Sequence, residues 1–201
     1  MQTRAKYKIC RRLGSSVFEK CQTQKYAISE AKKTKKSDKR PKAKSDFGLQ
    51  LLEKQRIRFT YNITERQFRK YVDESVAKKG ASAADTLYDF LETRLDNVIY
   101  RTGMAVTRAL ARQMASHGHF LVNGKRTTVP SYRVRSGDVI SVREGSRKSV
   151  LFSELEKRAK GTIVPNWISF DPAKMEATIT GMPKNTESKL DFHTVLEFYA
   201  R

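Results

Sequence analysis

The architecture of this chain follows most directly from residues 94–142, which read RLDNVIYRTGMAVTRALARQMASHGHFLVNGKRTTVPSYRVRSGDVISV. Asn123-Gly124 lies between two runs rich in apolar and β-prone residues, and this pair predicts a tight two-residue hairpin turn. Ser136-Gly137-Asp138 indicates a second turn, after which residues 139–142 are predicted to form a closing strand. Because helical patterns come before the hairpin, the stretch predicts two or three helices followed by a small antiparallel sheet.

One long amphipathic helix is predicted to lead into this stretch. Its apolar positions recur at helical spacing over more than three turns, and they are Leu87, Phe90, Leu91, Leu95, Val98 and Ile99. Thr102-Gly103 is expected to end this helix. Thr107 is then expected to cap the next helix, and Gly118 to terminate it.

The flanking segments are also predicted to be mainly helical. A helix is expected from Asp46, and Thr64 with Gln67 matches a capping box at the start of another, whose apolar stripe comprises Phe68, Tyr71, Val72 and Val76. A short helix is expected to start at Ser153. The chain after that helix is punctuated by proline and expected to be extended, and the apolar run at residues 195–199 should dock on a core.

Charge is distributed unevenly along the 201 residues, whose formal net charge is +20. Residues 1–44 hold 15 Lys/Arg against 3 Asp/Glu (+12), and residues 94–148 hold 11 against 3 (+8). Residues 45–93 hold 8 of each, and residues 149–201 hold 7 of each. A merely solvated surface would mix the two signs throughout. The two basic segments therefore indicate a polyanionic partner, either nucleic acid or an anionic membrane surface.

Three parts of the chain are expected from this charge layout. They are a basic N-terminal arm (1–44), a helical scaffold made of two segments (45–93 and 149–201), and a small basic domain between those segments (94–148). Within the arm, residues 30–45 lack aromatic and β-branched apolar residues, so they are expected to be disordered until they meet a phosphate backbone. A solubilising tail and an import signal are the alternatives.

Composition also argues against several kinds of protein and site. No run of about 18 apolar residues could span a membrane, and no secretory signal follows the basic N-terminus. The chain has two cysteines, Cys10 and Cys21. A structural zinc site needs four ligands, so neither a metal nor a cofactor is expected. A disulfide would satisfy the count, but free thiols are expected in a reducing compartment. His117 and His119 have no third ligand near them in sequence, so contact with phosphate or ribose is the interpretation preferred for them.

The basic residues of the central segment are expected to lie on one surface. Arg108 and Arg112 are four residues apart, so both guanidinium groups would leave the same side of one helix. Lys125 and Arg126 would sit at the hairpin tip, and Tyr132 would either stack on an RNA base or pack in the core. A small, rigid, basic surface of this kind is typical of proteins that read structured RNA by its shape and backbone.

Several motifs of the same stretch resemble the RNA-binding domain of the family of the fourth protein of the small ribosomal subunit. TRALARQ, SHGHFLVNGK, VPSYRV and SGD occur in the family's order and spacing. Outside this domain, LLEKQRIRFTYNITERQFRKYV resembles the family's upstream helical segment, and VPNWISFDPAKMEATITGMP with VLEFYAR resembles its C-terminal end. The resemblance covers residues 45–201 well and residues 1–44 loosely.

The resemblance implies a mainly helical α+β fold, in which a helical domain of two segments carries an inserted S4-type RNA-binding domain. It implies a non-enzymatic subunit that is a primary binder of small-subunit (16S-type) rRNA, nucleates assembly of the 5′ region and contributes to translational accuracy. The implied partners are this rRNA, neighbouring small-subunit proteins such as uS5, and mRNA where it enters the subunit. The implied location is the cytoplasmic ribosome, with an organellar ribosome as the alternative.

Carried over by position, three sets of residues are expected to contact rRNA. In the RNA-binding domain they are Arg101, Thr107, Arg108, Arg112, Gln113, His117, His119, Asn123, Lys125, Arg126, Ser131, Tyr132 and Arg133. In the helical domain they are Lys54, Arg56, Arg58, Tyr61, Arg66 and Arg69. In the arm they are Arg4, Lys6, Lys8, Arg11 and Arg12.

The chain departs from the family pattern at several positions. Many family members carry a zinc knuckle of cysteines near the N-terminus, whereas this chain resembles the zinc-free form. Leu110 occupies a position where the family has Glu, so Thr107 loses its reciprocal capping partner. Asn62 replaces a usual glycine, and asparagine tolerates the positive φ expected there. Residues 15–44 diverge, which leaves the contacts of the arm open.

Three other functions compete with this interpretation. Arg94-Leu95-Asp96 resembles the RLD stretch of pseudouridine synthases, in which the Asp is catalytic. No block of about 150–200 residues remains for a catalytic domain, so Asp96 is expected to pair with an arginine or cap a helix. A stand-alone RNA-binding factor that rescues stalled ribosomal particles would need the basic domain but not the neutral flanks. A DNA-binding regulator would need a recognition helix or a zinc module, and neither is clear here.

Overall fold

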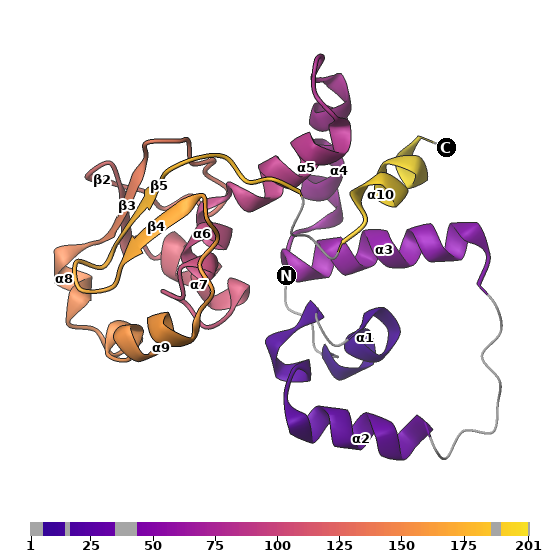
Figure 1. Cartoon of the computed structure of the whole chain (residues 1–201), viewed down its shortest axis with the longest axis horizontal. Helices are drawn as coiled ribbons and strands as arrows, with labels where there is room; N and C mark the ends of the chain where they lie inside the picture. The colour runs from indigo at the N-terminus through magenta and orange to yellow at the C-terminus, as the bar shows by residue number, and fades with distance from the viewer. Residues whose placement is uncertain (1–5, 15–16, 35–43, 186–189, 201) are drawn as a thin grey trace. The chain divides into compact units, whose positions relative to one another are not determined.

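The computed structural model describes residues 6–14, 17–34, 44–185 and 190–200. The chain divides into two compact units, which we call unit 1 (Met1–Leu87 with Glu187–Arg201) and unit 2 (Tyr88–Thr186). Unit 1 is helical, whereas unit 2 combines helices with a sheet (Figure 1). The mainly helical α+β class is therefore confirmed, and unit 2 is inserted between the two segments of unit 1.

Unit 1 consists of short and medium helices from both of its segments. In chain order these are α1 (Lys6–Leu13), the 3-10 turn η2 (Glu19–Cys21), α2 (Gln24–Thr34), α3 (Asp46–Thr60), α4 (Glu65–Ala77), the first half of α5 (Ala83–Glu92), and α10 (Phe192–Tyr199). The start of the stretch that was expected to be disordered, residues 30–34, continues α2. Its central part, residues 35–43, lies outside the described residues.

The connection from α3 to α4 follows from local chemistry that the sequence already indicated. Asn62 adopts a positive φ of 53°, which reverses the chain after α3. The Thr64 side chain then accepts a hydrogen bond from the Gln67 backbone N–H at 3.4 Å, as an N-cap residue does. The Gln67 amide nitrogen donates to the Tyr71 hydroxyl at 3.2 Å. The positive φ and the N-cap are both confirmed.

Helix α10 packs along α3, which confirms that the last apolar run docks on a core. The Phe198 ring lies 5.5 Å from that of Phe47, and the Tyr199 ring lies 6.1 Å from that of Phe68, measured between centroids.

The apolar stripe that was expected on α4 is wrong at one position. Val76 is 64% exposed, because the buried stripe of α4 continues one turn on at Ser75 instead.

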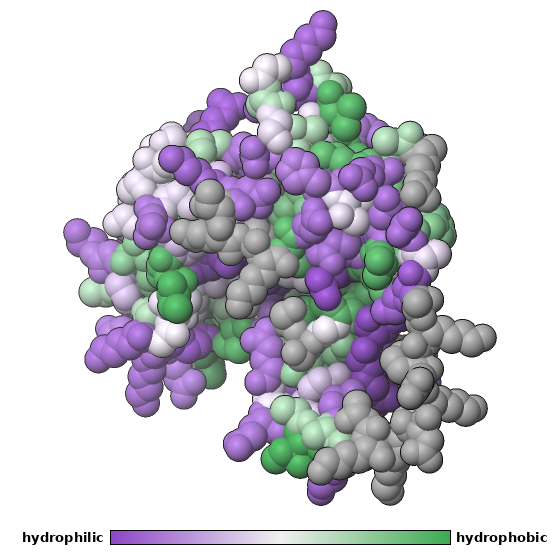
Figure 2. Space-filling view, turned by 45° about the vertical axis from the view of Figure 1, so that its right-hand side comes forward, coloured by the Kyte–Doolittle hydropathy of each residue, from purple (hydrophilic) through white to green (hydrophobic). Residues whose placement is uncertain are grey.

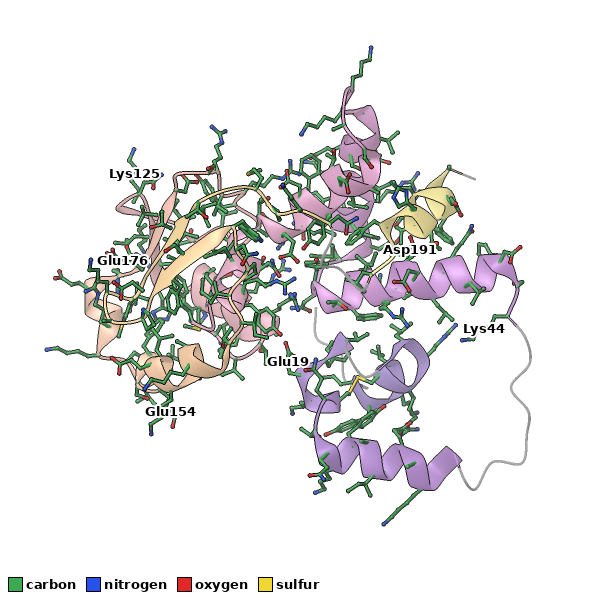
Figure 3. The ribbon with its side chains drawn as sticks, in the orientation of Figure 1. Glu19, Lys44, Lys125, Glu154, Glu176 and Asp191 are labelled. Carbon is green, nitrogen blue, oxygen red and sulfur yellow. A yellow bond between two sulfur atoms is a disulfide. The ribbon has the colours of Figure 1, made fainter. Side chains whose placement is uncertain are left out.

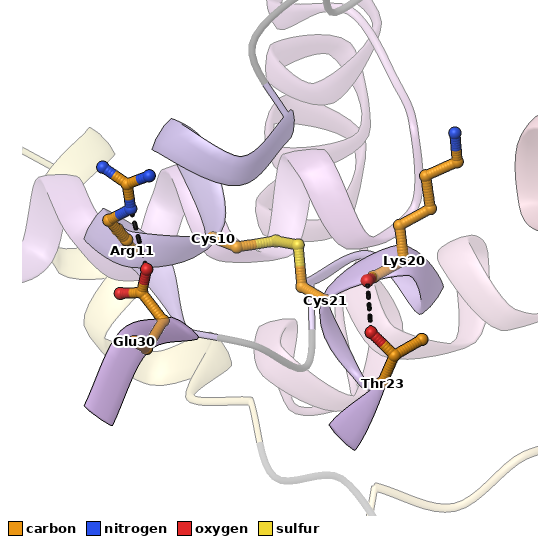
Figure 4. The surroundings of a disulfide bond; sticks show 6 residues. All are labelled: Cys10, Arg11, Lys20, Cys21, Thr23 and Glu30. Carbon is orange, nitrogen blue, oxygen red and sulfur yellow. Dashed lines mark hydrogen bonds and ion pairs between the residues drawn. A yellow bond between two sulfur atoms is a disulfide. The ribbon is translucent and has the colours of Figure 1, made fainter. Parts of the chain in front are cut away.

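Cys10 and Cys21 form a disulfide that joins α1 to η2, so the expectation of two free thiols is wrong (Figure 4). Both residues are buried in one small apolar cluster, together with Leu13, Val17 and others of the N-terminal segment. Their Cα atoms lie 6.5 Å apart, which is within the range that a disulfide spans. The expectation rested on compartment and number, and neither reports that the chain turns back here and buries both side chains together.

Unit 2 consists of the second half of α5 and the elements that follow it. These are α6 (Leu95–Arg101), α7 (Arg108–Ser116), β1 (Phe120–Val122), β2 (Lys125–Arg126), β3 (Val139–Val142), α8 (Glu144–Arg147), the 3-10 turn η3 (Val150–Phe152), α9 (Leu155–Gly161), β4 (Ile168–Asp171) and β5 (Glu176–Ile179). The hairpin and the closing strand stand where the sequence predicts them.

The strands of unit 2 form one antiparallel sheet of five strands in the order β2-β1-β3-β5-β4. Strand β5 pairs directly with β3, with Ile140 opposite Ala177. The segment from residue 149 was expected to belong to the helical scaffold. In the structure, β4 and β5 of this segment join the sheet, and unit 2 continues to Thr186 before the chain returns to unit 1.

The long helix predicted across residues 87–99 is wrong, because the structure has two helices there. The Arg94 backbone is extended (φ −65°, ψ 137°) and forms a bridge with Arg133. On either side, Leu95 N–H donates to Tyr132 O at 2.8 Å and Val134 N–H donates to Thr93 O at 2.9 Å. Pairing with a distant segment thus supplies the hydrogen bonds that a continuous helix would have made.

The core of unit 2 lies between the sheet and the helices of that unit. Phe120 and Ile140 project from the sheet, and Leu95, Ala111 and Phe152 are among the fully or almost fully buried residues that meet them. Outside the two cores, polar side chains cover much of the face seen in Figure 2, with apolar residues between them. Among the helices of the described segments, none is both long and apolar enough to cross a bilayer.

Candidate nucleic-acid interface

Helix α7 starts at a true N-cap, which the sequence predicted. The Thr107 side chain accepts a hydrogen bond from Leu110 N–H at 3.1 Å. Arg108, the first residue of the helix, donates from Nε to Asn97 Oδ1 at 2.8 Å, and its guanidinium carbon lies 4.2 Å from the centre of the Tyr100 ring. Arg112 is half-buried on the same helix. The expectation that both arginines contact RNA stays a prediction, and Arg108 is held in a defined orientation.

The buried carboxylate of Glu92 orients two arginines, Arg101 directly and Arg108 through Asn97. Glu92 is 0% exposed, and its carboxylate accepts hydrogen bonds from Arg101 Nη2 at 2.6 Å and Nε at 2.9 Å. It also accepts from Asn97 Nδ2 at 2.9 Å, and Asn97 in turn holds Arg108. One carboxylate at the end of α5 therefore orients two arginines that belong to α6 and α7.

The hairpin turn is formed as predicted, and its second strand carries two exposed cations, Lys125 and Arg126. Asn123 and Gly124 have φ values of 50° and 75°, which a type I′ turn requires. The Asn123 amide donates to Asp138 Oδ1 at 2.7 Å and accepts from Val139 N–H at 2.9 Å, so it ties the hairpin to the next turn. Lys125 is exposed and extends from β2 (Figure 3).

His119 is more enclosed than the RNA-contact expectation implied. Its Nδ1 lies 2.9 Å from Ser146 Oγ, and its ring packs edge-on against Phe152. Burial, together with the charges of His117, Arg143 and Arg126, lowers the pKa of His119 from its ordinary value. His117 caps the C-terminus of α7 and is exposed, as is Gln113 one turn earlier.

The segment that carries Ser131, Tyr132 and Arg133 runs alongside the break between α5 and α6. Tyr132 is 38% exposed, which places it at the surface and not in the core. The Arg133 guanidinium lies over the Phe90 ring, 3.9 Å from its centre. Ser131 is half-buried. An exposed aromatic ring such as that of Tyr132 is a surface on which an unstacked base could rest.

Asp96 does not stand free as a catalytic carboxylate would. Its two oxygens accept from Arg94 Nε at 2.9 Å and Nη2 at 2.6 Å, and both residues are almost completely buried. The expectation that Asp96 pairs with an arginine is confirmed. In the described segments no cluster of three or more His, Cys, Asp or Glu is placed to hold a metal ion.

In unit 1, two residues expected at the RNA surface are interior. Lys54 is 8% exposed. It donates to Glu65 at 2.8 Å, and its ammonium lies 4.5 Å from the centre of the Phe198 ring. Tyr61 is buried in the core. Both side chains are held by packing within unit 1, which the charge pattern of the sequence could not reveal.

The acid that holds Lys54 also binds Arg58 and Tyr199. Arg58 Nη1 donates to Glu65 at 3.1 Å and the Tyr199 hydroxyl donates at 2.7 Å. Burial raises the pKa of Glu65, but the hydrogen bonds from Lys54 and Tyr199 and the charges of Lys54 and Arg58 outweigh it, so the pKa is lowered overall.

Other cations of unit 1 differ in how far they are paired. Arg56 donates to Glu53 at 2.8 Å and to the Leu13 carbonyl at 2.9 Å. Arg66 and Arg69 are exposed on α4.

Four of the five arm residues that were expected to contact rRNA lie on α1. Lys8 and Arg12 are exposed and Lys6 is half-buried. Arg11 forms an ion pair with Glu30 of α2 at 2.9 Å (Figure 4). Arg4 lies outside the described residues.

Four polar residues that contact the side chains or backbone of the expected site residues were missed in the sequence: Glu92, Asn97, Arg143 and Ser146. Glu92 lies between apolar positions of the helix that was predicted across residues 87–99, and an acid in such a place signals a buried ion pair. Arg143 comes immediately after the closing strand, which places it beside the end of α7 through the pairing of Arg143 N–H with His119 O at 2.9 Å. No local signal identifies Asn97 or Ser146, because their partners are distant in sequence.

Comparison with known proteins gives consistent matches over the whole chain. Residues 1–92 match the family described as Ribosomal protein S4/S9 N-terminal domain, and residues 93–140 match the S4 domain. The chain is 41% identical over 204 residues to the small ribosomal subunit protein uS4 of Laribacter hongkongensis, covering 99% of this chain and 98% of that protein. It is 40% identical over 205 residues to uS4 of Acetivibrio thermocellus, with the same coverage. Over 159 residues it is 46% identical to uS4 of Chromobacterium violaceum, covering 78% and 77% of the two chains.

Proposed function

The chain belongs to the uS4 family of small ribosomal subunit proteins, and from that premise we propose that it binds small-subunit rRNA as a structural component without catalytic activity. The observation that supports this most is the Glu92 network. In this network, a fully buried carboxylate binds Arg101 directly and orients Arg108 through Asn97. Arginines fixed in this way would lose less side-chain freedom on binding phosphates than mobile ones.

Backbone phosphates are bound by the cations at the surface of unit 2. Arg112 and Lys125 supply charge from α7 and the hairpin, and Arg101 and Arg108 supply oriented guanidinium groups. Tyr132 offers a ring for stacking. In unit 1 the exposed Arg66 and Arg69, with Lys8 and Arg12 of the arm, extend the contact, whereas the interior Lys54 and Tyr61 are left out.

The finer role that we propose is the one that the family resemblance implies. The protein binds 16S-type rRNA as a primary binder in the cytoplasmic ribosome, nucleates assembly of the 5′ region and contributes to accuracy. Neighbouring small-subunit proteins such as uS5, and mRNA where it enters the subunit, are its further proposed partners.

The direct test compares the affinity of the full chain for a folded fragment of the 16S 5′ domain with its affinity for random RNA of equal length. We expect a clear preference for the folded fragment at matched salt. Replacing Arg112 and Lys125 by Gln should weaken binding and lower the slope of log K against log salt by roughly one to two units. The matched control is the double change of Lys157 and Lys160 to Gln, which removes the same charge from the exposed side of α9.

Equal affinity for both RNAs would overturn the proposal. Stoichiometry separates it from the stand-alone factor. A structural component should be present at one copy per purified small subunit. Absence of the protein from mature subunits would support the stand-alone factor.

A further inference from the structure

Four ionisable groups meet where α7 ends. His117 and His119 flank Gly118, and their ring centres lie 6.1 Å apart. Arg126 Nη2 donates to the His117 carbonyl at 3.3 Å, and Arg143 N–H donates to the His119 carbonyl at 2.9 Å. The charges of His117, Arg126 and Arg143 all oppose the protonation of His119. We call this set the α7-end cluster.

Gly118 creates the space in which the Arg126 guanidinium lies. Gly118 has a φ of +73°, and a Cβ atom at this position would collide with Nε, Nη2 and Cζ of Arg126. The absent side chain therefore lets the guanidinium lie directly against the backbone turn. From there it is close to both histidines, although like charges repel.

The ring of His119 is held at one nitrogen, which leaves the other for a ligand. Nδ1 lies 2.9 Å from Ser146 Oγ. A hydroxyl can donate or accept, so this contact survives when His119 gains a proton. The other elements around the ring add little charge. In α8, Glu144 is exposed, and Arg147 is directed to Val142 O at 3.3 Å and to Glu176 at 4.0 Å.

We propose that the α7-end cluster binds one RNA phosphate, clamped by Arg126 and Arg143, and that His119 takes up a proton as the phosphate binds. The inference rests on the proposed RNA-binding function and adds Arg143, Ser146 and a proton to it. A phosphate would replace cation–cation repulsion by attraction, and the imidazolium would donate from Nε2 to a phosphate oxygen while Nδ1 stays on Ser146.

The direction of the pH effect follows from linkage. In the free protein, burial and then the neighbouring cations disfavour protonated His119 and lower its pKa, and a bound phosphate favours the protonated form. Between the two pKa values the complex carries more protons than the free protein, so affinity rises as pH falls from about 7 through the range near and below 6.5. The increase is at most about tenfold per pH unit for one proton.

The binding experiment measures affinity of the full chain for the folded 16S fragment from pH 7.5 to 5.5 at constant salt. We expect wild type to gain about three- to tenfold on acidification, and His119→Gln to lose most of this gain. The matched control is His193→Gln, which removes the exposed histidine of α10 and should keep the gain. Arg143→Gln should weaken binding and lower the salt slope by about one unit, whereas Arg147→Gln on the neighbouring helix should leave the slope unchanged.

A second measurement follows the pKa of His119 itself, first without RNA. In the free full-length protein, Arg143→Gln should raise the pKa of His119, followed by its ring proton signals in NMR, because a repelling charge is removed. Addition of the fragment to wild type should raise it as well.

Each outcome is decisive. If the fragment binds but the pH gain is equal in wild type and His119→Gln, the cluster is not the phosphate site and the proposed function stands. If wild type does not prefer the fragment at any pH, the proposed function fails first.

Discussion

Replacing Glu92 by Gln should destabilise unit 2 strongly although the side chain keeps its shape. The carboxylate accepts three side-chain hydrogen bonds, two from Arg101 at 2.6 and 2.9 Å and one from Asn97 at 2.9 Å. The amide of Gln removes the negative charge and turns an NH₂ group toward these donors. Arg101 would then keep a positive charge in a site built to neutralise it.

The magnitude follows from the burial of the two partners. Removing one member of a buried ion pair costs about 3–5 kcal/mol, and hydrogen bonds to charged groups contribute about 1.5–3 kcal/mol each. Glu92 is fully buried, but the Arg101 side chain is 32% exposed, so water can solvate part of its charge. We therefore expect a loss of about 2–4 kcal/mol in the free energy of unfolding of unit 2.

Trp167 provides the assay, because it is the single tryptophan of the chain and belongs to the core of unit 2. Its fluorescence during urea unfolding of the full chain reports this unit. With a slope of about 2 kcal/mol per M, the midpoint should fall by about 1–2 M. The control is Glu156→Gln, an exposed acid of α9 in the same unit, which should change stability by less than about 0.5 kcal/mol.

A double-mutant cycle with Arg101→Gln isolates the pair. If the carboxylate stabilises the unit through Arg101, the coupling free energy should be about 1.5–3 kcal/mol. A loss below about 1 kcal/mol for Glu92→Gln, or a coupling near zero, would refute the reasoning that this acid anchors the arginine cluster.

Three further predictions follow from single contacts. Asp191→Ala removes the N-cap of α10 and should cost about 1 kcal/mol near neutral pH. Because hydrogen bonds from Thr194 lower the pKa of Asp191, the difference from wild type should disappear as pH falls below about 3.9, which acid titration of stability measures. Gly118→Ala should cost about 1 kcal/mol or more from its positive φ and displace Arg126, so RNA affinity should fall as well. Reduction of the Cys10–Cys21 disulfide should destabilise unit 1 by about 3 kcal/mol for a loop of this length, checked by urea unfolding with and without reductant. Unchanged stability in any of these measurements would contradict the corresponding contact.

The features that sequence predicts correctly are those that depend on a few adjacent residues. The Asn123-Gly124 turn, the positive φ of Asn62 and the N-caps at Thr64 and Thr107 all follow from the chemistry of one residue and its near neighbours. Neither distant packing nor burial can easily change these preferences, since each satisfies local backbone groups. This local information also located the hairpin and the basic helix of the candidate interface.

The features that sequence could not predict depend on residues far apart in the chain. The apolar spacing from Leu87 to Ile99 is helical throughout, yet the helix breaks because Thr93 and Leu95 pair with Val134 and Tyr132. Strand β5 joins the sheet through β3, more than thirty residues earlier. Periodicity reports which face of a segment is buried, and it does not report what that face meets.

The charge count of a segment does not report which charged groups meet in space, and this limits the prediction of the interface from charge. By count Glu92 belongs to a neutral segment and Arg101 to a basic one, yet the structure pairs them. If bulk charge governed RNA binding, Glu92→Gln would raise the net charge by one and strengthen binding to any RNA. If oriented arginines govern it, the same change should weaken binding to the folded 16S fragment, because Arg101 and Arg108 lose their anchor, while affinity for random RNA stays equal or rises. Measuring both affinities at matched salt decides between the two, and a parallel increase for both RNAs would show that position contributes nothing beyond charge.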